Sequence, residues 1–201
     1  MSARRRLRGE EPAPSEDEAR LYGRALRLLA AHDRTASDLR RRLERYGEAE
    51  TVARVIARLE AQRYVDDRRY AESWTEREAM ERGGGERLVR AGLRAHGVAE
   101  PLVEEAASRA GAAEAATALA LARKAAGRTR GLAPEVRVRR LAAQLARRGF
   151  RSGVVYAAVR EALAEERLGE AGEMALDTLS LIDDAASGAA DGAADDPGEA
   201  G

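Results

Sequence analysis

Two adjacent aspartates, Asp66 and Asp67, are the residues of this chain whose type and spacing come nearest to a metal site. Neighbouring carboxylates can bind Mg²⁺. The pair also stands where a helix is expected to begin, and aspartate is favoured there because its carboxylate accepts a backbone N–H and complements the helix dipole. We therefore interpret the pair as a helix cap and predict no metal site.

The other residue types that could support catalysis are scarce. The chain has no cysteine and only two histidines, which excludes a thiol nucleophile and a Cys-ligated metal. His32 and His96 stand at expected helix C-termini, where the dipole favours histidine. The run Gly83-Gly84-Gly85 lacks the Gly-Lys-Ser/Thr and the preceding strand of a phosphate-binding loop. We predict a non-enzymatic protein without catalytic residues, cofactor or metal.

The charged residues are divided unevenly along the 201-residue chain. Residues 1–166 carry 34 basic and 26 acidic residues, and residues 167–201 carry one basic and nine acidic residues. The formal net charge of zero therefore combines a body of +8 with an end of −8. A basic body suits a polyanion or an acidic protein surface, for which the acidic end could compete. The simpler interpretation is that the acidic end only adds solubility.

The elements that carry these residues are predicted to be helices throughout. An acidic residue follows three positions after Ser15 and three positions after Thr35, as in a capping box. Gly47 is placed as a helix C-cap with positive φ, Pro134 in the first turn of a helix, and Ser152 as a helix N-cap. Apolar residues recur at intervals of three and four, and no segment alternates with a period of two. The fold class is all-α.

One local pattern recurs three times, with an aliphatic residue, a leucine, a glycine and a second aliphatic residue at fixed intervals. The copies are Leu39, Leu43, Gly47, Val52; Val89, Leu93, Gly97, Leu102; and Leu141, Leu145, Gly149, Val154. A period near 50 residues indicates tandem units. Three three-helix repeats in an elongated, curved array are predicted, with the three leucines in the core. Alternatively, the repeat reflects only the stacking of helices and indicates nothing about function.

The predicted domain boundaries follow from this period and from composition. A disordered basic tail is expected at 1–14, repeats at 15–63, 64–110 and 111–168, and an acidic, mostly disordered tail at 169–201 that starts with a weak helix. The chain has no apolar run long enough for a membrane span and no signal-peptide core, so we expect a cytoplasmic protein. We expect a monomer because the helix packing leaves no exposed apolar stripe.

Arginine supplies 34 of the 35 basic residues and is concentrated in the second helix of each repeat. Arginine binds carboxylates and phosphates in a bidentate manner. The candidate contact surface consists of Arg40, Arg41, Arg87, Arg90, Arg94, Arg139, Arg140, Arg147 and Arg148. Seven aromatic residues are too few for a base-stacking platform, so any DNA binding should be weak, phosphate-directed and salt-sensitive. An ordinary solvated face is the alternative.

Several segments resemble one known family. They are residues 22–30 (YGRALRLLA), 59–72 (LEAQRYVDDRRYAE), 82–88 (RGGGERL) and 147–150 (RRGF), in the order and spacing of the RecX regulatory proteins. The resemblance covers about residues 18 to 166. The chain departs from the family pattern at Gly85, where proline is expected, and in its acidic end.

The resemblance implies three tandem three-helix units that bind the RecA recombinase and its filament on single-stranded DNA. Family members modulate RecA, usually by inhibiting its ATPase, strand-exchange and coprotease activities, in DNA repair and the SOS response. A direct DNA-binding helical regulator is the first alternative. A helical scaffold for another partner is the second.

Overall fold

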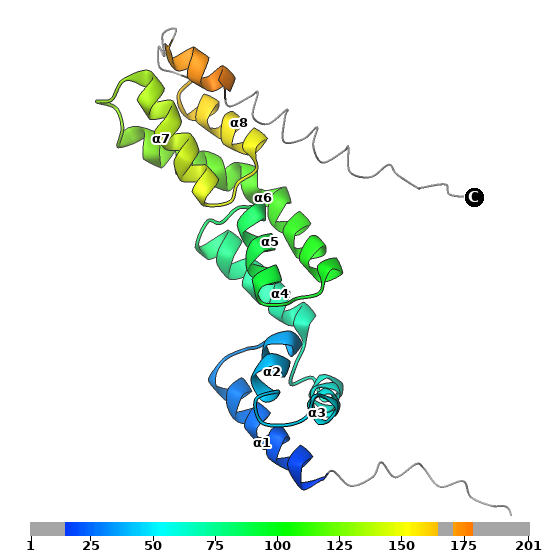
Figure 1. The fold of residues 1–201 in the computed structure, drawn as a ribbon. Coiled ribbons are helices and arrows are strands. Elements are labelled where there is room, and N and C mark those ends of the chain that lie inside the picture. The colour runs from blue at the N-terminus through cyan, green and yellow to red at the C-terminus, as the bar shows by residue number, and fades with distance from the viewer. Residues whose placement is uncertain (1–14, 165–170, 179–201) are drawn as a thin grey trace, which may run out of the picture. The chain divides into compact units, whose positions relative to one another are not determined.

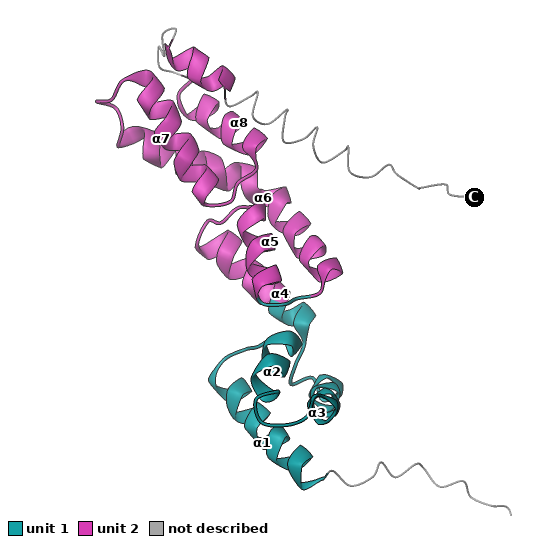
Figure 2. Ribbon diagram, in the orientation of Figure 1, with its two compact units in different colours: residues 1–70, 96–98 teal, residues 71–95, 99–201 magenta. Residues whose placement is uncertain are grey.

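A computed structural model describes residues 15–164 and 171–178 of the chain (Figure 1). These residues form helices and connecting turns without a strand, so the all-α prediction is confirmed. The predicted tail at 1–14 lies outside the described residues, as does the predicted tail at 169–201 except for residues 171–178. The chain divides into two compact units (Figure 2). Unit 1 extends to Tyr70 and includes His96–Val98, and unit 2 comprises Ala71–Ala95 and the chain from Ala99 onward.

Unit 1 is built from α1 (Glu16–Ala31), α2 (Ala36–Leu43), α3 (Ala49–Ala61) and the start of α4 (Asp67–Thr75). The hydroxyl of Ser15 accepts a hydrogen bond from Glu18 N at 3.2 Å, and that of Thr35 accepts one from Asp38 N at 3.1 Å. Both predicted N-caps are therefore confirmed. The large side chains of the unit 1 core are Leu21, Leu39, Leu43, Val52, Val55, Ile56 and Leu59.

The predicted positive φ at Gly47 is wrong. Among the described residues, the glycines with positive φ are Gly83, Gly97 and Gly149. Gly47 instead packs closely: a Cβ at this position would lie 2.6 Å from Cδ1 of Leu21, so the Leu21 side chain would have to shift. The turn after α2 therefore favours a small residue by close packing, whereas the equivalent glycines of the other two repeats supply a left-handed backbone.

The two aspartates considered for a metal site fix helix N-termini instead. Oδ1 of Asp66 accepts a hydrogen bond from Arg69 N at 3.0 Å at the start of α4, as predicted for a cap. Oδ1 of Asp67 accepts one from Ala36 N at 2.8 Å, which satisfies a free N–H in the first turn of α2. The part of the chain that the structure describes contains no cluster of three or more His, Asp or Glu side chains able to hold a metal ion.

Unit 2 contains the rest of α4, a π-helical turn η1 (Glu76–Glu81), α5 (Glu86–Ala95), α6 (Glu100–Gly127), α7 (Pro134–Arg147) and α8 (Ser152–Ala162). Residues 171–178 are also helical, within the segment predicted as a weak helix. The largest buried side chains of unit 2 are Leu93, Leu141, Leu145, Phe150 and Leu163. The three repeat leucines Leu43, Leu93 and Leu145 are at most 1% exposed, which confirms their predicted place in the core.

The second and third repeats share one helix. α6 runs for 28 residues across position 110/111, which is the predicted boundary between the second and third repeats. The alanine-rich sequence on both sides of that position has high helix propensity and contains no proline after Pro101, so the helix continues through Gly111. The N-terminal half of α6 completes the second repeat, and its C-terminal half begins the third.

Two terminus predictions in unit 2 had different outcomes. Pro134 is the first residue of α7, as predicted. The prediction that Ser152 caps α8 is wrong by one residue: Ser152 is already helical, and Arg151 occupies the N-cap position without a side-chain cap. The Arg151 side chain instead extends to α6, where its Nε lies 2.7 Å from Oε1 of Glu114. A contact between repeats therefore replaces the local cap.

Candidate arginine-rich interaction surface

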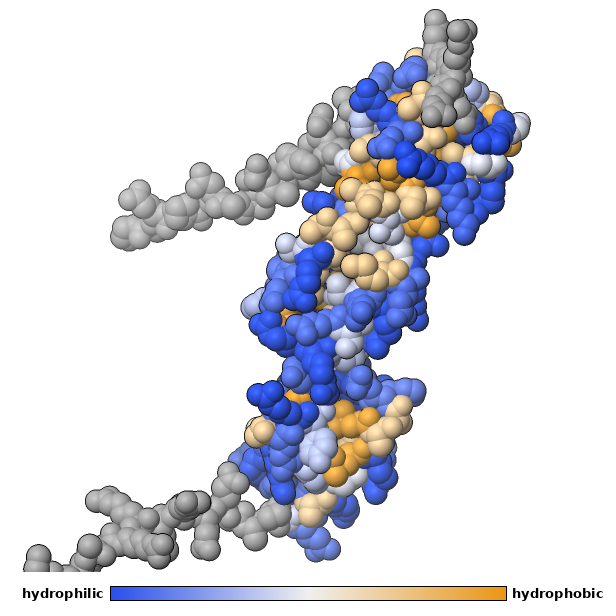
Figure 3. Space-filling model, turned by 180° about the vertical axis from the view of Figure 1, so that it is seen from behind, coloured by the Kyte–Doolittle hydropathy of each residue, from blue (hydrophilic) through white to orange (hydrophobic). Residues whose placement is uncertain are grey.

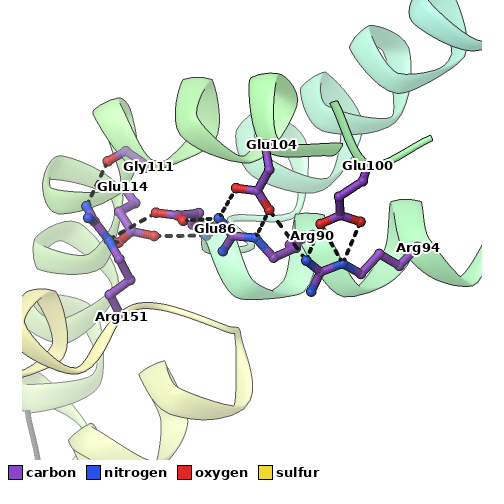
Figure 4. A network of polar contacts seen from close by, with 8 residues as sticks. All are labelled: Glu86, Arg90, Arg94, Glu100, Glu104, Gly111, Glu114 and Arg151. Atoms are coloured by element: carbon purple, nitrogen blue, oxygen red, sulfur yellow. Dashed lines mark hydrogen bonds and ion pairs between the residues drawn. The ribbon is translucent and has the colours of Figure 1, made fainter. Parts of the chain in front are cut away.

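Two of the three arginines of α5, Arg90 and Arg94, are paired with glutamates. Arg90 binds both carboxylate oxygens of Glu104 at 2.9 Å and Oε1 of Glu86 at 2.8 Å (Figure 4). Hydrogen bonding to Glu104, strengthened by Glu86, raises the pKa of Arg90 above its usual range. Arg94 is paired with Glu100 and Glu104. These two predicted contact residues are therefore engaged within unit 2.

A buried glutamate joins the second and third repeats. Glu114 lies on α6 and is 2% exposed. Its Oε2 accepts a hydrogen bond from Glu86 N at 2.9 Å, at the N-terminus of α5, and its Oε1 pairs with Arg151 (Figure 4). A carboxylate at a helix N-terminus is stabilised by the free N–H groups and by the dipole. Glu114 was not singled out in the sequence analysis. The only indication in the sequence is a single acidic residue within an alanine-rich stretch of a helix.

Backbone contacts complete the same junction. Gly85 N donates to Arg148 O at 2.7 Å, and Arg87 N donates to Gly149 O at 3.0 Å. The guanidinium of Arg148 donates in turn to Arg82 O at 2.6 Å. Arg148 is half-buried and holds the turn after η1, so its role is structural. We therefore take it out of the candidate contact surface.

The arginines of α7 are placed differently from those of α5. Arg139, Arg140 and Arg147 are exposed, and none of the three has an ion pair within residues 15–164 and 171–178. The Nε of Arg139 makes one hydrogen bond, to Glu135 O at 3.3 Å. The opposite face of α7 is buried through Val138, Leu141 and Leu145. We name the outward side chains Arg139, Arg140 and Arg147 the α7 arginine face.

A neighbouring arginine of α7 points inward. Arg137 is 4% exposed. Its Nη2 donates to Ala126 O at 3.2 Å, and its Nε donates to Thr129 Oγ1 at 3.3 Å. The position of Arg137 beside Val138 on the helix explains its burial, because both lie on the side that packs against α6. Local arginine density alone therefore overstates the charge that α7 offers to a partner.

The remaining predicted contact residues are Arg40 and Arg41 of α2 and Arg87 of α5. All three are exposed. Arg41 pairs with Asp38 at 2.7 Å, whereas Arg40 and Arg87 have no ion pair among the residues described. The nine predicted arginines thus separate into three paired side chains, the structural Arg148, and five open ones, of which three lie on α7.

Asp38 is the centre of an arginine cluster in unit 1. Its carboxylate lies 2.8 Å from Arg34, 2.7 Å from Arg41 and 2.9 Å from Arg42. Burial by itself would raise the pKa of Asp38, but the hydrogen bonds from Arg42, Arg41 and Arg34 outweigh it and hold the pKa well below the ordinary value. Ionised Asp38 therefore stabilises unit 1 above the ordinary pKa of aspartate, and this contribution is lost as the pH falls through the lower folded-state pKa.

Asp38→Asn is expected to lower the free energy of unfolding by about 2 kcal/mol at pH 7, because three guanidinium groups lose a partly buried partner. The difference between the two proteins should shrink below about pH 4, where the carboxylate of the unfolded chain becomes protonated. Urea unfolding followed by circular dichroism, at pH 7 and at a pH below about 4, measures the difference in free energy of unfolding. Asp17→Asn is the matched control: Asp17 pairs with Arg20, but both side chains are 72% exposed. Its expected effect is within about 0.5 kcal/mol, and a pH-independent Asp38→Asn effect would contradict the prediction.

Polar residues predominate on the surface. In the view of Figure 3, hydrophilic residues cover most of both units, and apolar residues show as separate patches. The large apolar side chains that are exposed are Tyr46, Tyr64, Met80, Leu88 and Met174. No helix within the described ranges is long and apolar enough to cross a membrane.

The fold and this surface define a protein of tandem three-helix repeats that presents arginine side chains on one helix of its third repeat. Family models for the first, second and third three-helix domains of RecX match residues 22–59, 66–106 and 112–159. The chain belongs to the RecX family of regulatory proteins.

Individual relatives agree with this assignment. The chain is 39% identical over 160 residues to "Regulatory protein RecX" of Thermobifida fusca, which covers 79% of this chain and 86% of that protein. It is 35% identical over 167 residues to the protein of the same name from Streptomyces coelicolor, covering 82% and 88%. A crystal structure of regulatory protein RecX superposes with a TM-score of 0.65 at 26% identity, over 77% of this chain and 82% of that one. RecX from Lactobacillus salivarius has the same fold, with a TM-score of 0.66 at 20% identity over 73% and 97%.

Proposed function

We propose that this protein binds the RecA recombinase on its single-stranded DNA filament and inhibits the RecA ATPase, and with it strand exchange and coprotease activity. It acts as a non-enzymatic monomer in the cytoplasm, within DNA repair and the SOS response. Membership of the RecX family is the observation that supports the partner, because its relatives are named regulatory proteins of that family. The α7 arginine face supplies side chains that can bind carboxylates or phosphates.

The contact surface is proposed to centre on this face, together with Arg87 of the same unit, and Arg40 of unit 1 is proposed as a separate contact. These arginines are exposed and have no ion pair in the part of the chain described, so a partner does not have to break an existing pair. The paired guanidinium groups of Arg41, Arg90 and Arg94 would have to leave a carboxylate first. They are therefore expected to contribute less.

The test is the single-stranded-DNA-dependent ATPase of RecA, titrated with this protein. We expect inhibition at substoichiometric ratios, together with co-sedimentation of the protein with RecA–DNA filaments. An unchanged ATPase rate without co-sedimentation would overturn the proposal.

Direct DNA binding is the second candidate, and the unpaired state of the α7 arginine face favours it. A protein that neutralises Z phosphates loses DNA affinity with a slope of about −0.9Z in log–log salt plots. Affinity for naked DNA is therefore expected to fall steeply between low and moderate salt. If inhibition of RecA persists at salt concentrations where naked DNA is released, the filament protein and not DNA is the primary partner.

A further inference from the structure

The α7 arginine face has no acidic counterpart on its own helix surface. The one acidic residue of α7, Glu135, is half-buried in the first turn, and only its backbone carbonyl contacts Arg139. On α5, by contrast, each of Arg90 and Arg94 is matched by glutamates of α6. Two of the three arginines of α5 are therefore paired with glutamates, whereas the α7 arginine face has no such partner among the described residues.

The last described helix packs against the same core as α7. The helical residues 171–178 pack through Leu176, which is 4% exposed and belongs to the same hydrophobic cluster as Leu141 and Leu145 of α7. The inward face of α7 is thus part of the core that anchors the last described helix. Residues 179–201 follow directly from that anchor point.

The sequence after the anchor complements the arginine face in charge. Residues 179–201 contain no basic residue and six acidic ones, namely Asp183, Asp184, Asp191, Asp195, Asp196 and Glu199. Twenty-three residues can reach about 75 Å when extended, whereas the 14 residues of α7 span about 21 Å. Length is therefore no obstacle to contact with all three arginines.

We propose that residues 179–201 dock on the α7 arginine face and occupy it until an acidic partner surface or a phosphate backbone displaces them. The acidic end then acts as an internal competitor, because the same guanidinium groups cannot bind both sets of anions at once. Its effect on RecA rests on the function proposed above, whereas the docking itself does not.

Docking is measured without RecA. The chain has no cysteine, so Ala190→Cys gives a single site for a nitroxide spin label in the full-length protein. In amide NMR spectra at about 0.02 M salt we expect the signals of α7 to lose about half of their intensity or more, and those of α3 to be little changed. The loss should be relieved at about 0.5 M salt, where the screening length falls to a few ångströms.

Two triple variants make this result specific. Changing Arg139, Arg140 and Arg147 to glutamine should abolish the signal loss on α7. The control changes Arg27, Arg45 and Arg69 to glutamine; these are exposed arginines of unit 1 without an ion pair among the residues described, so the signal loss should persist. Broadening of α7 that is absent, insensitive to salt or retained in the first variant would overturn the docking.

The competition is measured by RecA inhibition. Changing the six acidic residues of 179–201 to amides should lower the concentration needed for half-inhibition by about threefold or more. The partner would then no longer have to displace the acidic segment from the α7 arginine face. The charge-matched control neutralises the exposed Asp33, Glu44, Glu48, Glu60, Glu76 and Glu81 and should give a smaller change. An equal change in both variants would overturn the competition. A wild-type protein that never inhibits RecA would instead refute the proposed function and leave the NMR result standing.

Discussion

Replacing Gly149 with alanine is expected to destabilise unit 2 by about 3 kcal/mol or more, a large effect for one methyl group. Gly149 has φ of +80°, and a Cβ there would lie 2.7 Å from Cβ of Leu88 and would overlap the backbone N of Leu88. A left-handed backbone costs a non-glycine residue about 1 to 2 kcal/mol on its own. The overlap adds to this cost because α5 must move away from the turn that accepts its Arg87 N–H.

Trp74 provides the measurement, since it is the only tryptophan of the chain and lies in unit 2. Urea unfolding followed by its fluorescence should show a lower midpoint for Gly149→Ala. Gly127→Ala is the matched control: this glycine ends α6, and a Cβ there would have no neighbour within 4 Å. Alanine should raise stability there by up to about 1 kcal/mol, through helix propensity. Equal midpoints for the two variants would show that the contact between Gly149 and Leu88 does not hold the repeats together.

Local chemistry made part of this architecture predictable. A hydroxyl three residues before an acidic residue was enough to locate the N-caps at Ser15 and Thr35, because both partners of the hydrogen bond lie within one turn. The repeat leucines were predictable for a similar reason, since helical spacing alone determines which side chains share a face. Gly47 shows the limit of this reasoning. The preference for a small residue at Gly47 comes from the Leu21 side chain of another helix and not from its own φ.

The contacts that distinguish paired, open and backbone-bonded arginines connect residues far apart in the sequence. Arg148 and Arg82 are separated by 66 positions, and Glu114 and Glu86 by 28. A helical pattern indicates which face a residue occupies but not which element lies opposite. Arg90, Arg140 and Arg148 therefore looked equivalent in the sequence. Only the fold shows that the first is paired, the second is open and the third is bonded to backbone.

Reversing the charge of the α7 arginine face, with Arg139, Arg140 and Arg147 changed to glutamate, is expected to weaken RecA inhibition by about tenfold or more. Three cations become three anions on a surface proposed to meet carboxylates or phosphates, and tenfold corresponds to only about 1.4 kcal/mol of binding free energy. Stability should change little, because the three side chains are exposed and have no ion pair within the described residues. The half-inhibitory concentration in the RecA ATPase assay and the urea midpoint of Trp74 fluorescence measure the two effects separately.

The control for this variant must carry the same change in net charge, because a more acidic protein is repelled by a RecA–DNA filament wherever its charges lie. Glutamate at Arg27, Arg45 and Arg69 provides that control on unit 1 and should weaken inhibition less. A general field effect depends on total charge and is screened by salt, so it would weaken both variants equally and disappear near 0.5 M salt. A contact surface on α7 instead gives a difference between the two variants that remains at moderate salt. Full inhibition by the α7 variant, with an unchanged urea midpoint, would exclude this helix as the binding face.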